Sequence, residues 1–240
     1  MAILLTHKVS IHDLTDATSY TTNTGGSAGS FTPAANTTHY CVVENRKTAT
    51  APDTPTITTT TGLTFTQIAT QLSGNSVMLL TLFEALGVPS PTNGTVTADF
   101  GANTQIAGSV HVGEMTGVDL SNPFKTANVQ TANDGSSSTS SPAITLAAIA
   151  AGNGTFAAYA QTLNAGGHNQ EAGWTELFDG THASPISNVS TAFRADGDTT
   201  PTATAPATAG RWCVIGIELE AEAAVAAVPK FNPYPQLLAH

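Results

Sequence analysis

The sequence predicts an all-β protein, an antiparallel two-sheet sandwich of jelly-roll-like order. Threonine occupies 40 of the 240 positions, whereas lysine and arginine together occupy 7. Threonine is β-branched and suits the solvated face of a strand, while helical surfaces normally carry lysine and glutamate. Short apolar or alternating segments also recur along the chain between residues that favour turns, which is typical of sheets.

Eleven segments have the pattern of strands. Asn93 and Asn153 each precede a glycine, a pair suited to tight turns, and the prolines within 52–55 and 89–91 cannot continue a central strand. With no convincing helix, this pattern predicts two sheets packed face to face. The expected strands are residues 40–46, 63–70, 77–85, 94–100, 108–116, 144–149, 156–162, 174–178, 189–195, 200–205 and 212–220.

A faint internal repeat runs through the chain. Three segments of the first half resemble three of the second half, in the same order. We interpret them as two similar halves that fold against one another, as the paired Greek keys of a jelly roll would. The matching pairs are 65–70 with 174–179, 82–85 with 192–195, and 108–112 with 210–214.

Two flanks fall outside this pattern, so we expect a sandwich domain over 36–220. Residues 1–35 begin with a weakly apolar run and continue into a Gly- and Ser-rich stretch, which predicts an N-terminal arm and linker. The prolines of 221–240 predict an extended C-terminal arm. It either folds back on its own sandwich or lies on another chain, and we expect the second. Its apolar side chains, the expected assembly contacts, are Phe231, Tyr234, Leu237 and Leu238.

The charge of the chain disfavours nucleic acid and membranes as partners. The net charge of −10 and the pI near 4.9 leave no basic stripe for nucleic acid and disfavour anionic lipid. The apolar run 1–5 is too short for a signal peptide or a membrane span.

Cys41 and Cys213 are most simply two buried thiols, although they could bridge if the first and last strands were neighbours.

No catalytic residues are expected. Gly25, Ser27 and Gly29 match the G-x-S-x-G pattern of a nucleophile elbow, but no strand and helix flank them, which favours a linker. A glycosidase needs two carboxylates across a groove, and Glu84, Glu114 and Glu176 form no paired motif. The sequence therefore predicts a non-enzymatic protein.

Neither a metal nor another cofactor is expected. The histidines show no zinc-binding spacing, and the aspartates of 13–16 and 196–198 suit solvated turns as well as calcium. Trp174 and Trp212 could stack on sugars, but their apolar surroundings favour burial. The expected core residues are Phe65, Phe83, Trp174, Phe193 and Trp212.

Four segments together resemble a β-sandwich domain of virion-surface proteins of tailed bacteriophages. They are GLTFTQI at 62–68, GTVTADFG at 94–101, EMTGVD at 114–119 and GWTEL at 173–177, and the resemblance covers roughly residues 39–220. The chain departs from that pattern at Phe83, where tryptophan is usual, and at Met115, where an aromatic residue is common. No catalytic residues belong to the pattern. The resemblance implies a structural or attachment role as capsid decoration, head fibre or tail-associated protein.

The expected function is therefore that of a virion component, assembled in the host cytoplasm and displayed on the particle surface. It would coat and reinforce the particle as a homo-oligomer, with trimers favoured, in contact with the major capsid protein or another virion protein. Two alternatives stay open. One is a carbohydrate-binding attachment module that recognises a host glycan, and the other is a self-assembling filament subunit.

Overall fold

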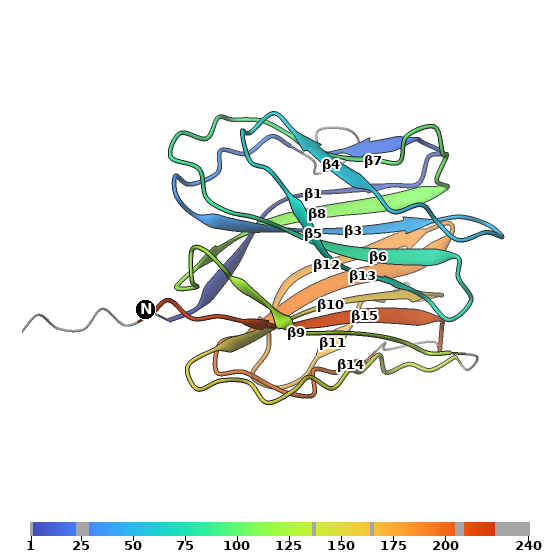
Figure 1. Ribbon diagram of the computed structural model, residues 1–240. Helices are drawn as coiled ribbons and strands as arrows, with labels where there is room; N and C mark the ends of the chain where they lie inside the picture. Colours follow the sequence, from blue (N-terminus) through green and yellow to red (C-terminus); the bar gives the residue numbers. More distant parts are fainter. Residues whose placement is uncertain (1, 23–28, 136–137, 164–165, 205–208, 224–240) are drawn as a thin grey trace, which may run out of the picture.

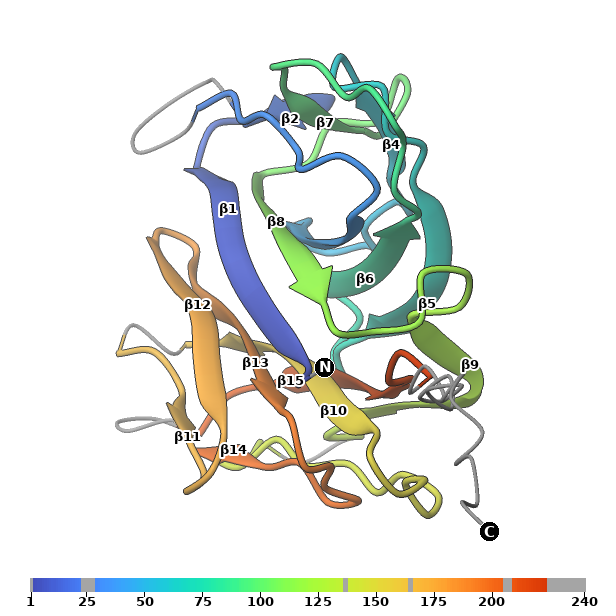
Figure 2. The same ribbon diagram turned by 90° about the vertical axis from the view of Figure 1, so that its left-hand side faces the viewer.

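The computed structural model describes residues 2–22, 29–135, 138–163, 166–204 and 209–223 (Figure 1). As the sequence predicts, the protein is all-β, and two five-stranded antiparallel sheets face each other. A three-stranded sheet covers the outer side of one large sheet and a two-stranded sheet covers the other, so the molecule has four layers (Figure 2). No helix in the described ranges is long and apolar enough to cross a membrane.

The first half of the chain builds one large and one small sheet. The large sheet has the order β1-β8-β3-β6-β5, and the small sheet has the order β2-β7-β4. The strands are β1 (Leu4–Asp13), β2 (Ser19–Thr21), β3 (Thr38–Arg46), β4 (Thr56–Thr59), β5 (Thr66–Leu72), β6 (Met78–Ala85), β7 (Val96–Asp99) and β8 (Ala107–Thr116).

The second half repeats this plan. Its large sheet has the order β12-β13-β10-β15-β9, and β11 pairs with β14 in the outer layer. The strands are β9 (Phe124–Asn133), β10 (Gly154–Thr162), β11 (Asn169–Gln170), β12 (Thr175–Ala183), β13 (Ile186–Arg194), β14 (Ala203–Thr204) and β15 (Trp212–Leu219). Every strand of the central sheets therefore has a counterpart in the other half: β1 and β9, β8 and β15, β3 and β10, β6 and β13, β5 and β12.

The repeat seen in the sequence corresponds to this duplicated topology. The pairing of β5 with β6 shifts between Gln67 and Ala69, and that of β12 with β13 shifts between Glu176 and Phe178, the positions that the sequence aligns. A β-bulge is therefore kept in both copies. The other two alignments pick the right strands but are out of register. The ladders make Phe193 the counterpart of Glu84 rather than of Phe83, and Val214 the counterpart of Val110 rather than of Val112.

The halves are not, however, the two interleaved Greek keys of one jelly roll. Each half forms its own large and small sheet, with β1-β8-β3-β6 on one side and β2-β7-β4 on the other in the first copy. The jelly-roll-like arrangement is thus built once per half, and the two large sheets then pack on each other.

Alternating side chains create three separate cores. On β3, Tyr40 and Val42 face the other large sheet, whereas Cys41 and Val43 face the small sheet. The central core lies between the large sheets, where Tyr40 and its counterpart Phe156 have ring centroids 5.0 Å apart. An outer core lies under each small sheet.

The five aromatic residues expected in one core are spread over all three. Phe193 is in the central core, Phe83 and the half-buried Phe65 are under the first small sheet, and Trp174 and Trp212 are under the second. Both indoles also donate hydrogen bonds, Trp174 to Asp198 and Trp212 to Thr139. Buried in this way, neither tryptophan offers a face to a sugar.

The prediction of an N-terminal arm is wrong for much of residues 1–35, because these residues belong to the sheets. β1 pairs along its length with β8, β2 pairs with β7, and Phe31 is buried and bonded to Gly94. β1 escaped detection because its pairing shifts between His7 and Val9, which breaks the alternation of apolar residues. The C-terminal side chains Phe231, Tyr234, Leu237 and Leu238 lie outside the described residues.

The expected strands change at two further points, whereas the expectation of two buried thiols is confirmed. Residues 144–149 form no strand, although Ile144 and Leu146 donate backbone hydrogen bonds to Pro201 and Thr199 beside the second small sheet. Strands β4, β9 and the short β11 were not predicted. Cys41 and Cys213 are free, buried thiols on opposite large sheets, and burial raises the pKa of each.

Candidate functional site

The large sheets meet along two seams. On one side β1 lies beside β12, and on the other side β5 lies beside β9. The duplication makes these seams equivalent, because β9 is the counterpart of β1 and β12 that of β5. They nevertheless carry different side chains: a cluster of histidines lies along the first seam, and a polar groove lies along the second.

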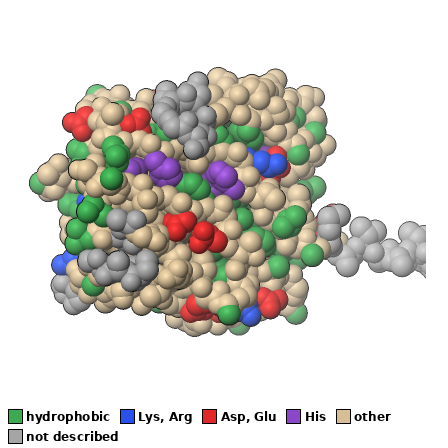
Figure 3. Space-filling view, turned by 180° about the vertical axis from the view of Figure 1, so that it is seen from behind, with side chains coloured by type: hydrophobic (Ala, Val, Ile, Leu, Met, Phe, Trp, Pro, Cys, Tyr) green, Lys and Arg blue, Asp and Glu red, His purple; other side chains and the backbone are tan. Residues whose placement is uncertain are grey.

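A histidine cluster occupies the β1–β12 seam. His7 and His12 come from β1, His111 from β8, and His182 and Phe178 from β12. The rings stack on one another. The ring centroid of Phe178 lies 4.4 Å from that of His111 and 4.9 Å from that of His12, and the centroids of His7 and His111 are 4.7 Å apart. Histidine side chains reach the surface on the face seen in Figure 3. The seven histidines show no such grouping in sequence, because the fold brings together residues from both halves.

Beneath this stack lies a buried polar network. The hydroxyl of Ser109 donates to the carboxylate of Glu44 at 3.4 Å, and it lies 2.7 Å from Nε2 of His182 and 2.9 Å from Nδ1 of His12. Ser187 also donates to Glu44, which is fully buried. The network therefore ties β1, β3 and β8 of the first half to β12 and β13 of the second.

Serine, histidine and glutamate here do not have the geometry of a catalytic triad. In a triad the carboxylate orients the histidine through one ring nitrogen while the other faces the serine. Here Glu44 and Ser109 both approach Nε2 of His182, at 3.3 Å and 2.7 Å. Ser109 is also only 1% exposed. We assign the network a role in joining the two sheets.

The β5–β9 seam carries a groove of about 820 Å³, here called the Arg211 groove. Gln71, Leu72 and Ser73 line it from the first half, and Asn133 and Arg211 line it from the second. Arg211 donates to the buried carboxylate of Asp134 at 2.9 Å, and Asn133 donates to the carbonyl of Leu72 at 3.0 Å. The lining combines amides, hydroxyls and one guanidinium over an apolar floor.

The carboxylates considered for glycoside hydrolysis do not converge. Glu84 points toward the central core, and burial raises its pKa. Glu114 points to the opposite face of the same sheet, where Lys8 binds it at 2.6 Å and His39 at 3.3 Å. Glu176 is exposed on β12 in the other sheet. Since the two faces of a sheet cannot flank one substrate, Glu84 and Glu114 do not form a glycosidase pair.

The aspartates considered for calcium have protein partners. Arg194 binds Asp196 at 2.6 Å and Asp198 at 3.2 Å, and Asp198 also accepts from Trp174. Asp13 accepts from Thr15 within a turn. Among the residues that the structure describes, no group of histidine, cysteine or carboxylate side chains is placed to hold a metal ion.

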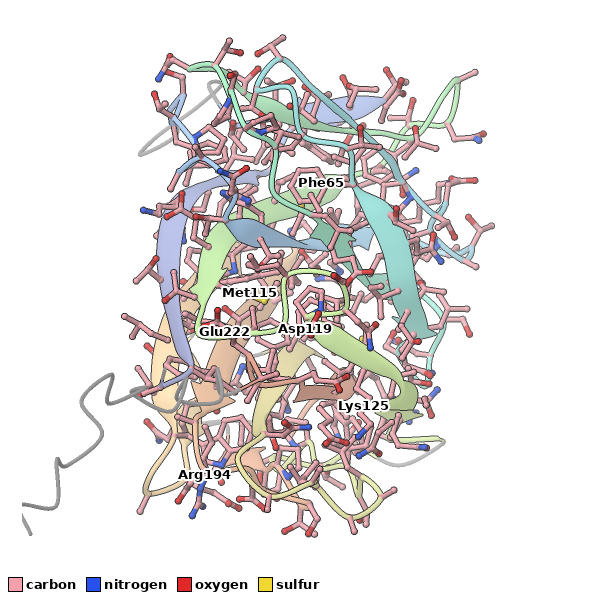
Figure 4. The ribbon with its side chains drawn as sticks, turned by 60° about the vertical axis from the view of Figure 1, so that its left-hand side comes forward. Phe65, Met115, Asp119, Lys125, Arg194 and Glu222 are labelled. Atoms are coloured by element: carbon pink, nitrogen blue, oxygen red, sulfur yellow. The ribbon has the colours of Figure 1, made fainter. Side chains whose placement is uncertain are left out.

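Both ends of the described chain meet at one end of the sandwich, here called the terminal end (Ala2, Leu4, Gly117, Leu120 and Ala221). The amide of Glu222 donates to the carbonyl of Gly117 at 3.0 Å, and a Cβ on Gly117 would lie 2.2 Å from the carbonyl oxygen of Ala2. Figure 4 shows Asp119 and Glu222 together in front of Met115. Leu4 and Leu120 are 52% and 51% exposed there.

No family model, no curated protein and no solved structure matches this chain.

Proposed function

We propose that the protein is a non-enzymatic structural component of a bacteriophage virion surface, a capsid-decoration or head-fibre protein anchored through its terminal end. The arrangement of the chain ends is the observation that carries this role. Ala2 and Glu222 both lie beside Gly117, so the described chain begins and ends where Leu4 and Leu120 are exposed. Apolar contacts with a neighbouring subunit or shell protein would therefore gather at one place.

The rest of the surface carries little charge, which suits a protein that is displayed on a particle. Only 10% of residues are charged, and Lys8, Lys47, Lys125, Arg194 and Arg211 all have carboxylate partners. The four segments that resemble phage virion-surface domains lie within the two repeats. Identical copies would assemble symmetrically, and trimers suit a capsid three-fold axis.

Removing the apolar side chains of the C-terminal arm should abolish assembly. A variant with Phe231, Tyr234, Leu237 and Leu238 changed to alanine keeps the length and prolines of the arm but loses its apolar anchors. We expect an unchanged melting temperature and a shift from oligomer to monomer, measured by size-exclusion chromatography with light scattering. The matched control changes Asn232 and Gln236 of the same arm to alanine and should still assemble. A quadruple variant that keeps the wild-type mass would contradict the proposed role of the arm.

The Arg211 groove favours a second candidate function, binding of a carboxylate-bearing oligosaccharide. Its volume is in the range of small-molecule sites, and its amides and hydroxyls can bond sugar hydroxyls while Arg211 faces the acid group.

Titration calorimetry with oligogalacturonate, compared with a neutral maltooligosaccharide, tests this second function. Asn133→Ala should raise the Kd for oligogalacturonate about tenfold, which corresponds to a loss of about 1.4 kcal/mol of binding free energy. Gln67→Ala on the exposed part of β5 is the control and should bind normally. Absence of binding to oligogalacturonate, or equal binding of both saccharides, would exclude this function without affecting the assembly role.

A further inference from the structure

The two seams are equivalent in topology but differ in titratable side chains. Four histidines line the β1–β12 seam, whereas β5 and β9 contain no histidine. We propose that the β1–β12 seam is an acid-triggered release point: protonation of its histidines separates β1 from β12, while the β5–β9 seam holds the two halves together. This conformational device is independent of the proposed virion role.

The seam is packed so closely that it has little room to adapt to new charges. Phe178 stacks between His111 and His12, and the planes of Phe178 and His12 are inclined by only 7°. A Cβ on Gly180 would lie 1.9 Å from Cε1 of His12, so only glycine allows β12 to approach β1 this closely. His7 is exposed and His12 is partly buried, but His111 and His182 are fully buried, and water cannot readily solvate an imidazolium ion at those two positions.

The hydrogen bonds define where additional protons would go. Because the Ser109 hydroxyl has a single proton for Glu44, His12 and His182, at least one of the two imidazoles donates to Ser109 through the nitrogen that faces it. The next proton on such an imidazole binds its other ring nitrogen, Nε2 of His12 or Nδ1 of His182. Within the described residues both nitrogens are buried without a hydrogen-bond partner, and so is Nε2 of His111. Each added N–H would therefore be buried and unsatisfied.

The charges around the seam can offset only one such proton. From β3, Glu44 supplies an anion 3.3 Å from Nε2 of His182, Arg46 supplies a cation, and Tyr40 packs against His111 at 5.4 Å. From β13, Ser187 and Thr191 contribute only neutral hydroxyls. Protonated His182 can pair with Glu44. A further positive charge on His7, His12 or His111 repels those already present, and the attraction of Glu44 for His12 does not outweigh burial and this repulsion.

The pH range follows from the direction of the pKa shifts. Burial lowers the pKa of His7 and His111 below 6.5 and that of His12 to about 4. The released state takes up protons near the ordinary pKa of 6.5, and the closed state does so only at lower pH. Closure of the seam is therefore fully favoured above pH 6.5 and weakens as the pH falls toward 4.

Hydrogen-exchange mass spectrometry of the full-length protein at pH 7.5 and pH 5 tests the proposal. After correction for intrinsic rates, amides of β1 and β12 should exchange at least tenfold faster at pH 5, while those of β5 and β9 should not change. Equal acceleration of all four strands would indicate global unfolding and overturn the proposal, and so would exchange of β1 that is independent of pH.

Two variants keep the test specific to the seam. The double change His7→Phe and His12→Phe retains ring stacking and should suppress the acid-induced opening, whereas His168→Gln, outside the seam, should leave it unchanged. If the double variant misfolds, Glu44→Gln provides the second test. Without the carboxylate that lies 3.3 Å from His182, opening should begin at higher pH, and an unchanged or lower pH of opening would overturn the proposal.

Discussion

Replacing Phe156 by alanine is expected to lower the free energy of unfolding by about 3–5 kcal/mol. Phe156 is fully buried on β10 at the centre of the interface between the large sheets, where its ring lies 5.0 Å from that of Tyr40 and 5.6 Å from that of Phe124. Both halves lose contacts, because these partners come from different sheets. At roughly 2–4 °C per kcal/mol for a chain of this size, the melting temperature should fall by about 10 °C.

Leu14→Ala is the control for this substitution, because Leu14 is 43% exposed and lies outside all three cores. Its effect should stay within about 0.5 kcal/mol, as for most surface changes. Similar stabilities of the two variants in urea unfolding would show that the large sheets do not pack through Phe156.

Replacing Glu218 by alanine is expected to cost about 3–5 kcal/mol, the usual effect of removing one partner of a buried charge network. Glu218 is 1% exposed on β15 and accepts hydrogen bonds from Asn128 at 2.7 Å, Asn153 at 2.6 Å and the amide of Ala150 at 3.0 Å. Burial raises the pKa of Glu218. These hydrogen bonds and the one that Lys125 donates nevertheless hold this pKa below its ordinary value. Alanine would leave the buried amides of Asn128 and Asn153 without an acceptor.

Glu220 offers a matched control two residues farther along the chain. It is only partly buried and accepts from the exposed Asn122 at 3.0 Å. Glu220→Ala should therefore change the free energy of unfolding little, as expected for an exposed polar contact. Equal losses in the two variants would mean that the Glu218 network contributes no more than a surface contact.

The sequence was most informative where strands are central and apolar. β3, β6, β8, β10, β13 and β15, whose residues are mostly buried, all lie within or close to predicted segments. The edge strand β9 was missed because it is rich in Thr and Asn and only partly buried. The paired halves were detected, but which strands share a sheet depends on long-range pairing that local patterns do not encode.

The candidate sites were harder to predict than the fold. The histidine cluster joins His7 and His12 of one edge strand to His182 of another, and nothing in the spacing of these residues indicates their contact. One signal was present: within predicted strands, a histidine such as His111 alternates with outward-facing valines and so points inward. The Arg211 groove likewise depends on the packing of β5 against β9, which only the folded chain defines.

Electron cryomicroscopy of the assembled full-length protein tests the proposed anchoring through the terminal end most directly. We predict a closed oligomer in which contacts between copies involve Leu4, Leu120 and the C-terminal residues, with the two small outer sheets facing solvent. A protein that stays monomeric at all concentrations, or an oligomer whose contacts run through the small sheets and leave the terminal end exposed, would contradict it.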